Sequence, residues 1–544
     1  MEHLDRRKKI TIMAAIMVAV LFSSLNQNIV GTVLPKIVSE IGGMEYFNWV
    51  FTVYMLTSSV SAILAGKLSD IYGRRPLILI GIGIFLIGTF LNGLSQTMME
   101  LILHRALQGI GGGMILSSCF SVVGDLYSPR ERGRWQGLMS TSFAVAGVFG
   151  PTLGGWIVDH VRWHWVFWVF LPFGLVAFTL IWTLLPSVQK RKGETIDYWG
   201  SILLMLTIVP LLLAFSWGGN KFAWNSFAII GLLGVSVCAL IAFIQVERFV
   251  RNPVLPITLF RNRVFTISNL SGFTMGAGVF GATMFLPFFV QGVMGKTATE
   301  SGYVTMPFMI CNVLANNLSG QWMSRTGKYK KLVVSGMLIM AGGMGMLSLM
   351  NFQTPAWVLV LDLCIVGIGF GIGMPIFSVA TQNAVDQRML GVATASTQLF
   401  RQMGGTFGVS IMGTVLINRM QDELTKHETP LNSALDPTKL PPDVVENLAS
   451  LKDPQMLMDT EKLNQTQAAL PPDVLPAFES LVQILREVLS GALSSVFMTG
   501  AIIVSTTVVM CLFLKEIPLR TSNRSLSRNE SADRIDMKPT VGKS

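Results

Sequence analysis

Long apolar runs, separated by short polar breaks, fill most of the chain of 544 residues. A helix needs roughly 20 apolar residues to cross the hydrocarbon core of a bilayer. Only 13% of the residues are charged, whereas soluble proteins carry about 25%. No aqueous domain could bury this much apolar sequence, so we expect an all-α integral membrane protein. Fourteen runs fit this description, at about 10–34, 47–67, 76–96, 99–124, 134–157, 163–185, 198–217, 226–246, 264–290, 300–322, 332–350, 355–380, 391–417 and 488–514.

The placement of lysine and arginine predicts how these spans are oriented. The net charge is +10, but the basic residues gather in alternate short loops instead of forming one patch for a nucleic acid. Loops rich in lysine and arginine stay on the cytoplasmic side, and the number of spans is even, so we expect both termini in the cytoplasm. The expected surroundings are a lipid bilayer, with no nucleic-acid partner. The basic loops lie at 6–9, 74–75, 130–134, 190–192, 248–263, 325–331 and after 515, and the intervening short loops hold Lys36, Arg162, Lys221 and Lys296.

Enzyme and metal chemistry find little support in the sequence. Gly66-Lys67 is followed by Leu68, where a phosphate-binding loop needs serine or threonine, and the HExxH and GxSxG patterns do not occur. The five cysteines lie inside apolar runs without CxxC spacing, so we expect no disulfide and no metal site. We therefore expect no enzymatic activity and no cofactor. Transport would be driven by an ion gradient or by the substrate's own gradient.

A repeated turn divides the chain into two related halves. Residues 66–75 read Gly-Lys-Leu-Ser-Asp-Ile-Tyr-Gly-Arg-Arg, and residues 320–330 read Gly-Gln-Trp-Met-Ser-Arg-Thr-Gly-Lys-Tyr-Lys. In both, a glycine ends an apolar run, a second glycine follows seven residues later, and basic residues come next. Repeats of this kind are typical of transporters built from duplicated bundles. We expect two six-helix bundles with two additional helices inserted between them.

The repeat also sets the expected domains. The first apolar run is too long for a signal peptide, and we expect it to be retained as a helix. The long polar segment contains Leu-Pro-Pro-Asp-Val twice and an amphipathic stretch after Pro476, which indicates either a helical hairpin or a solvated loop outside the membrane. The expected units are an N-terminal bundle at 1–186, two inserted helices with linkers at 187–262, five helices of the second bundle at 263–418, the extracellular segment at 419–487, the last helix at 488–515 and a disordered cytoplasmic tail at 516–544.

Several motifs resemble signatures of one transporter family. Residues 66–75 resemble the loop 2–3 signature of the major facilitator superfamily, Leu101-x-x-x-Arg105-x-x-Gln108-Gly109 resembles its second motif, and residues 146–155 resemble its antiporter motif. The resemblance covers all the spans but neither the extracellular segment nor the tail, and it implies the fold of that family. Similarity to the fourteen-span drug/proton antiporter branch comes from Trp163-His-Trp165, Ile196-Asp197-Tyr-Trp-Gly200, Pro287-x-x-x-Gln291 and Arg401-Gln-x-Gly404-Gly405.

The resemblance implies a conformational latch at the first turn. Glycines there let two helices approach closely, and Asp70 would meet a helix N-terminus and a loop arginine, Arg132 or Arg134. Charge that only sets topology is the alternative. In the second copy Ser324 replaces the acid, so that half should be held less tightly. The expected latch residues are Gly66, Asp70, Gly73, Arg74 and Arg134.

A stripe of small residues in the fifth span is the expected gate. Small residues allow close packing of helices in a bilayer, here against a helix of the other half. By the resemblance this packing forms a gate hinge that limits leakage, and packing alone would give the same sequence. The residues are Gly147, Gly150, Pro151, Gly154 and Gly155.

Arg105 and Asp362 are the expected proton-coupling residues. An ionisable group inside a span is costly and is usually functional, and both lie about seven residues into their spans, in nearly matching places of the two halves. Asp362 would carry the proton, and Arg105 would tune that acid or hold an anionic group. The alternative for Asp362 is a position at the outer interface. For Arg401, deep in its span, a structural salt bridge or a helix-cap role is as plausible as coupling.

The expected substrate cavity contains amides where related proteins have acids. Members of the family commonly carry an acidic residue in the first span, where this chain has Asn26. Amides cannot carry protons or neutralise a cation, so the cavity should suit monocations, neutral amphiphiles or anions better than dications. The expected wall residues are Asn26, Tyr54, Gln108, Phe280, Met284, Phe288, Gln291 and Asn316.

Together these patterns predict a multidrug efflux transporter in the cell membrane of a bacterium. It would act as a monomer and exchange hydrophobic or amphiphilic compounds for protons by alternating access. One alternative is an exporter or uniporter of a physiological lipid or metabolite. A membrane-embedded scaffold or receptor, acting through the extracellular segment, is the alternative from another class.

Overall fold

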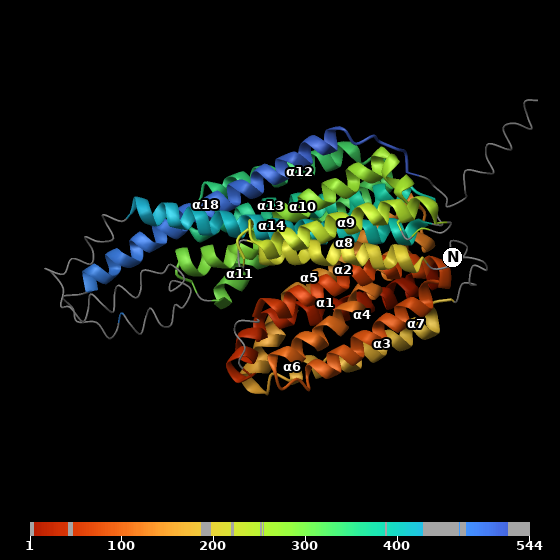
Figure 1. Ribbon diagram of the computed structural model, residues 1–544, viewed down its shortest axis with the longest axis horizontal. Coiled ribbons are helices and arrows are strands. Elements are labelled where there is room, and N and C mark those ends of the chain that lie inside the picture. The colour runs from red at the N-terminus through yellow and green to blue at the C-terminus, as the bar shows by residue number, and fades with distance from the viewer. Residues whose placement is uncertain are drawn as a thin grey trace, which may run out of the picture.

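The structure, a computed structural model, describes residues 5–41, 47–186, 197–218, 222–250, 253, 255–296, 298–386, 389–427, 467 and 475–519. These residues form an elongated bundle of helices (Figure 1), and no strand longer than an isolated bridge occurs among them. The first part contains α1 (Arg6–Ile41), α2 (Phe47–Tyr72), α3 (Arg74–Asn92), α4 (Met98–Leu126), α5 (Pro129–His160), α6 (Trp165–Trp168) and α7 (Leu171–Leu184). The middle contains α8 (Tyr198–Trp217), α9 (Phe227–Phe249) and η2 (Ile257–Arg261). The last part contains α10 (Arg263–Pro287), η3 (Phe288–Val293), α11 (Ala298–Thr326), α12 (Lys330–Ser348), α13 (Ala356–Asn383), α14 (Leu390–Lys426) and α18 (Leu475–Leu512).

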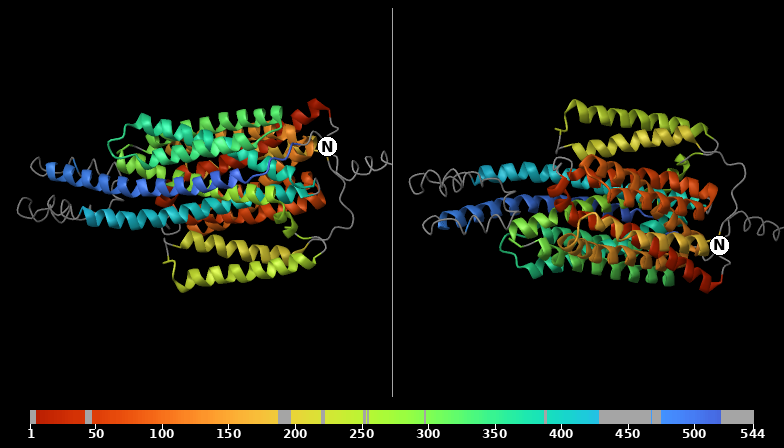
Figure 2. Two further views of the ribbon diagram at one scale, coloured as in Figure 1. Left: turned by 90° about the horizontal axis from the view of Figure 1, so that it is seen from above. Right: turned by 90° about the horizontal axis from the view of Figure 1, so that it is seen from below.

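The helices group into two bundles and a separate pair. Helices α1 to α7 pack on one another, as do α10 to α18, and the bundles meet where α5 packs on α11 and α2 packs on α14. The pair α8–α9 lies on one flank (Figure 2), where α8 packs against α2 of the first bundle and α14 of the second. The pair α8–α9 therefore packs beside both bundles and not within either of them.

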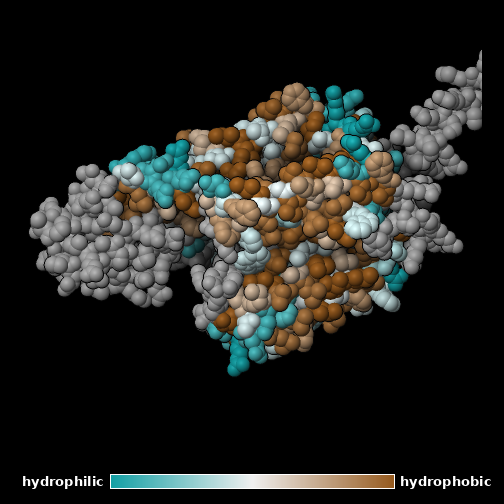
Figure 3. Space-filling model, in the orientation of Figure 1, coloured by the Kyte–Doolittle hydropathy of each residue, from teal (hydrophilic) through white to brown (hydrophobic). Residues whose placement is uncertain are grey.

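The sides of the molecule suit a bilayer. Ten of the described helices are long and apolar enough to cross a membrane, and hydrophobic residues cover the sides of the bundle in Figure 3. Such an exposed apolar belt is the reverse of a soluble protein's surface. One end, near the N label in Figure 1, carries the turns α2–α3 and α4–α5, and we call it the basic end.

Both glycine turns of the sequence repeat have a positive φ at the second glycine. Gly73 closes the turn between α2 and α3 with φ 93°, and Gly327 closes the turn between α11 and α12 with φ 70°. Residues with a side chain rarely adopt this left-handed conformation, which explains why both copies have glycine there. The repeat seen in the sequence is therefore also a structural repeat.

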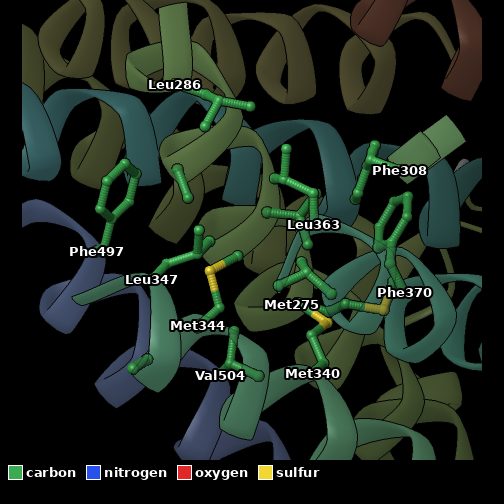
Figure 4. Close-up of a cluster of buried hydrophobic side chains, with 14 of the residues drawn as sticks. Met275, Leu286, Phe308, Met340, Met344, Leu347, Leu363, Phe370, Phe497 and Val504 are labelled. Atoms are coloured by element: carbon green, nitrogen blue, oxygen red, sulfur yellow. The ribbon is translucent and has the colours of Figure 1, made fainter. Parts of the chain in front are cut away.

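The second bundle has a core rich in methionine. Met275, Met340 and Met344 are almost fully buried, and Figure 4 shows them among phenylalanine and leucine side chains that come from several helices. Flexible thioether side chains fill irregular gaps and adapt when neighbours shift. Such a core suits helices that change their packing.

Helices α14 and α18 extend further than the sequence predicts. The extracellular segment was expected at 419–487, but α14 continues to Lys426 and α18 begins at Leu475. Proline fits the first turn of a helix, so Pro476 marks the start of α18, and the amphipathic stretch after it is part of this helix, with Phe478 and Leu481 buried. Figure 2 shows the two extensions side by side beyond the bundle. The repeats at 440–444 and 470–474 lie outside the described residues.

Candidate functional site

The two bundles meet along two seams, one between α2 and α14 and one between α5 and α11. On both seams, glycines make the contact near the basic end. A Cβ at Gly66 of α2 would lie 2.7 Å from the carbonyl oxygen of Gly391 in α14. On the other seam, a Cβ at Gly320 of α11 would collide with the carbonyl oxygen of Gly133 in α5. Backbones can approach this closely only without side chains. The first glycine of each repeated turn is therefore the point where one half contacts the other.

Asp70 connects α2 to α14 across the first of these seams through its negative charge. Its carboxylate pairs with the guanidinium of Arg74 at 2.5 Å and accepts the backbone N–H groups of Gly391 and Val392 at 3.3 Å each. These amides open α14, where the helix dipole favours a negative charge. Arg74 in turn pairs with Asp125 at 2.9 Å. One buried charge network thus ties the turn of the first half to the start of α14.

The arginine partner of Asp70 differs from the loop arginines suggested by the sequence. Arg134 is exposed on α5, and the described ion pairs of Asp70 do not include it. Arg132 is buried and donates to the carbonyl groups of Tyr127 and Gly124. Arg74 is the ion-pair partner of Asp70 because it follows Asp70 by four residues, across the turn that contains Gly73.

The small residues of α5 pack mainly inside their own half. A Cβ at Gly150 would lie 3.1 Å from Asn28, and one at Gly154 would lie 2.5 Å from Ile29, both on α1. Of these three glycines, Gly147 alone faces the other half. A Cβ there would lie 3.7 Å from the side chain of Met309 on α11, which is an ordinary contact distance. Pro151 and Gly155 lie on the same helix, which continues through them to His160. The expected packing against the other half is therefore wrong for Gly150 and Gly154.

Arg105 forms a fully buried polar network with three predicted cavity residues. Its Nη1 donates to Gln108 at 2.5 Å, and its guanidinium lies over the ring of Tyr54 at 4.5 Å. Gln108 also donates to Thr89 at 2.6 Å and to Asn26 at 3.5 Å. The contacts of Arg105 with described residues are all with its own half and include no carboxylate.

Asp362 lies apart from Arg105, in the second bundle. It is the seventh residue of α13 and is 1% exposed, and its Oδ1 has no hydrogen-bond partner. The side chain is therefore packed among other side chains, about 10 Å along α13 from the start of the helix. Because Arg105 is on α4, the matching register of the two residues reflects the duplication and not a contact.

A small cavity lies between the bundles. Its volume is about 20 Å³, which holds about one water. Its walls come from both halves and include the predicted residue Asn316 and the ambiguous Arg401. The lining residues are Phe120, Gln136, Asn316, Met374, Pro375, Ser378, Thr394, Thr397, Gln398 and Arg401.

The other four predicted wall residues do not line this cavity. They follow one stripe along α10 and η3, and Phe280 and Met284 are 42% and 55% exposed. Phe280 contacts the ring of Phe370 on α13. The remaining two are Phe288 and Gln291.

Of the four lining residues on α14, the sequence analysis identified Arg401 alone, although all four fit one face of a helix. Thr394, Thr397, Gln398 and Arg401 are spaced by three or four residues within an apolar run. This spacing places polar side chains on one face of a helix. Gln136 had no comparable signal, since its role depends on α5 meeting the other half.

Comparisons with known proteins agree on one family. A sequence profile described as Major Facilitator Superfamily matches residues 16–409. The chain is 38% identical to the multidrug transporter protein MdtP of Bacillus subtilis (strain 168), over 97% of the chain and 96% of that protein. It is 31% identical to multidrug resistance protein 3 of the same organism, over 94% and 96%.

Solved structures share the fold at low sequence identity. The human organic anion transporter MFSD10 (TETRAN) has a TM-score of 0.59 and 13% identity, over 91% of this chain and 99% of that one. The proton:xylose symporter XylE has a TM-score of 0.55 and 15% identity, over 78% and 91%. At these identities the likeness concerns the fold alone.

Proposed function

Because the chain belongs to the major facilitator superfamily, we propose that it is a multidrug efflux transporter that exports hydrophobic and amphiphilic compounds by alternating access. The observation that carries this proposal is the similarity to multidrug transporters along nearly the whole chain. Two bundles that meet at glycine crossings, with a cavity between them, supply the moving parts. Binding at such a cavity, exposed to each side in turn, is how duplicated transporters work.

We propose that the basic end faces the cytoplasm, in the membrane of a bacterial cell. Basic loops favour this orientation. Both seams are closed at that end by Gly66–Gly391 and Gly133–Gly320, so the conformation is one closed to the cytoplasm. The latch at Asp70 favours this conformation because its partners lie on opposite halves.

Fourteen transmembrane helices, as in the drug/proton antiporter branch, are part of the proposal. Ten helices are apolar enough by themselves. Helices α5, α11 and α14 are more polar, and each lies on a seam between the halves, where it faces protein more than lipid. The short apolar helix α8 packs beside α9 and completes the set.

Proton exchange would be carried by Asp362. A buried carboxyl group inside a span, with no hydrogen-bond partner for its Oδ1 among the described residues, is suited to gain and lose a proton. Uniport of a lipid or metabolite remains the alternative, and Asn26 favours it because the first span lacks the acid common in the family.

Everted membrane vesicles test export and coupling together. An acidic lumen is preset, and the neutral amphiphile N-phenyl-1-naphthylamine is added outside, at the face that was cytoplasmic. We expect the lumen to lose its acidity faster than in vesicles without the protein. Export in intact cells without any such proton movement would favour uniport, and the absence of export of this and other amphiphiles would overturn the proposed function.

A further inference from the structure

We infer that the cavity between the bundles binds the anionic group of an amphiphilic substrate, such as a carboxylate, sulfonate or phosphate ester, with Arg401 as its counter-charge. The inference rests on the proposed export function and narrows its substrate class. It depends on three features of the cavity: the charge of its wall, an amide without partners and the origin of its residues in both halves.

The wall of the cavity carries a positive charge and no negative one. Among the lining residues that the structure describes, Arg401 is the one charged residue, and the other polar residues are amides and hydroxyl groups. Among the described residues, Arg401 has a hydrogen bond to Gln398 and no ion pair. A guanidinium without a counter-charge in a membrane protein is costly, so an anionic ligand would gain the most there.

The carboxylate of Asp362 lies too far away to neutralise Arg401. On α13 the cavity is lined by Met374 and Pro375, which follow Asp362 by 12 and 13 residues. At 1.5 Å per residue this is about 18 Å along the helix. Asp70 and Asp125, two further carboxylates on the helices that meet here, both pair with Arg74.

Asn316 supplies a second observation that indicates a ligand. It is 1% exposed and lines the cavity, and neither its Nδ2 nor its Oδ1 has a hydrogen-bond partner. Buried amide groups are nearly always hydrogen-bonded. An anion held by Arg401 would accept the Nδ2–H group of Asn316, which explains why a polar residue is kept at this place.

The geometry of the charged group favours an anion over other ligands. A guanidinium offers a planar fork of donors that matches carboxylate, sulfonate or phosphate oxygens. A cationic substrate would be repelled by Arg401, and a neutral one would leave it without a counter-charge.

The cavity accepts its ligand when the halves separate. At about 20 Å³ it is too small for an amphiphile in the closed arrangement. Phe120 and Gln136 come from the first bundle, whereas Asn316 and Arg401 come from the second. Opening of the basic end moves these walls apart, and Phe120 and Met374 then offer apolar surface beside the anion site.

Two dyes with one scaffold test the inference. 1-Anilinonaphthalene-8-sulfonate and N-phenyl-1-naphthylamine differ by the sulfonate group. Cells of a Gram-positive host that produce the full chain are loaded with either dye, and the rate of dye loss is measured on addition of glucose. We expect both dyes to be exported. Arg401→Gln should slow export of the sulfonate dye by about tenfold to a hundredfold, as expected for the loss of a charged hydrogen bond, and change export of the neutral dye much less.

Three further variants separate charge from folding. Arg401→Lys keeps the charge and should retain part of the sulfonate export. Asn316→Asp places a competing carboxylate on the cavity wall and should also reduce sulfonate export selectively. Arg419→Gln is the matched control, because this arginine lies on the same helix but is exposed and pairs with Asp422 at 3.7 Å. It should change neither rate.

The outcomes distinguish this inference from the proposed function. If the wild-type chain exports neither dye, the export function fails. If it exports the neutral dye but not the sulfonate dye, the anion inference is wrong and the export function stands. The inference is also overturned if Arg401→Gln and Asn316→Asp both leave the ratio of the two rates unchanged. Should Arg401→Gln lose both activities through misfolding, Arg401→Lys and Asn316→Asp decide.

Discussion

Asp70 binds two kinds of partner at once: the guanidinium of Arg74 in its own half, and two backbone amides of α14 in the other half. Breaking this arrangement should loosen the closed basic end without disturbing either bundle, because Arg74 keeps its ion pair with Asp125. We therefore expect substitutions of this residue to change the balance between two conformations more than the stability of the fold.

We predict that Asp70→Asn shifts the transporter toward an opening at the basic end. Asparagine keeps one acceptor oxygen, so the variant loses one hydrogen bond to a charged group, which contributes about 1.5–3 kcal/mol. The open fraction should therefore rise roughly tenfold or more. A cysteine at Thr394, in a chain with its native cysteines replaced by alanine, should then react faster with a membrane-impermeant maleimide added to everted vesicles.

The control for this substitution is Asp422→Asn. Asp422 is 58% exposed and pairs loosely with Arg419, and exposed pairs contribute little. Equal labelling of Thr394→Cys in the Asp70→Asn and wild-type backgrounds would contradict the latch.

Asp362→Asn should uncouple export from the proton gradient. The amide keeps the shape of the side chain but cannot exchange a proton. Because Oδ1 of Asp362 has no partner, we expect the purified variant to be at least as heat-stable as the wild type. A preset pH gradient should no longer collapse on addition of N-phenyl-1-naphthylamine. Unchanged collapse would remove Asp362 from the coupling mechanism.

The single residues show how far sequence patterns reach. Asn26, Tyr54 and Gln108 were expected to line the substrate cavity, and Arg105 to take part in proton coupling. In the structure the four form one buried network inside the first bundle and do not line the cavity between the bundles. The pattern within one span identifies such residues because burial repeats with the helical period. The partner of a buried polar residue depends on how segments pack in three dimensions, which a pattern within one span does not show. For this reason the sequence did not identify Arg74 as the ion-pair partner of Asp70.

Where helices of the two halves cross at glycines, the backbones are too close to leave room for a side chain. We predict that Gly320→Ala impairs export, because its methyl group would collide with the carbonyl oxygen of Gly133 across the seam. Overpacking of this kind costs about 1–3 kcal/mol, and here it would destabilise the closed conformation. The rate of dye loss from energised cells measures the effect.

Gly342→Ala is the matched control, since a Cβ there meets nothing within 4 Å. Replacing a mid-helix glycine by alanine should stabilise α12 by roughly 0.5–1 kcal/mol. Equal export by Gly320→Ala and Gly342→Ala would show that the seam does not need to close as tightly as this structure has it.

The extended helices α14 and α18 separate a structural part of the polar segment from an expendable one. Replacing residues 428–474 by a short Gly/Ser linker should leave export intact, because Phe478 and Leu481 of α18 keep their place in the core. Leu481→Asp should instead reduce the amount of folded protein, since it buries a charge. Membrane yield and dye export distinguish the two effects. Loss of export at normal yield in the linker variant would favour the receptor-like alternative.

At the level of whole helices, the sequence patterns predicted where helices occur more reliably than they predicted the residues at which the helices end. The expected apolar runs fall on helices of the structure, because runs of this length have few other solutions in a bilayer. The ends of α14 and α18 were missed because hydropathy stops where the membrane stops, whereas helix packing continues beyond it.

For the molecule as a whole, duplication was visible in the sequence, but the conformation was not. The glycine turns predicted two related bundles, and Gly73 and Gly327 both have a positive φ. Closure at the basic end depends on many contacts between halves, such as the hydrogen bond from Gln136 to Gln382 at 3.3 Å. A transporter must break these contacts in its cycle, so no single arrangement can be inferred from the sequence.

The inserted pair makes this duplicated molecule one-sided. Helix α8 lies across the junction of α2 and α14, where Trp217 packs on Trp49 of the first half and Trp224 donates to Thr414 of the second at 3.1 Å. The junction of α5 and α11 lies elsewhere on the bundle. One of the two junctions between the halves is therefore covered by additional helices, whereas neither described helix of the pair packs on α5 or α11. A molecule that approaches from the lipid would meet a different surface at each junction.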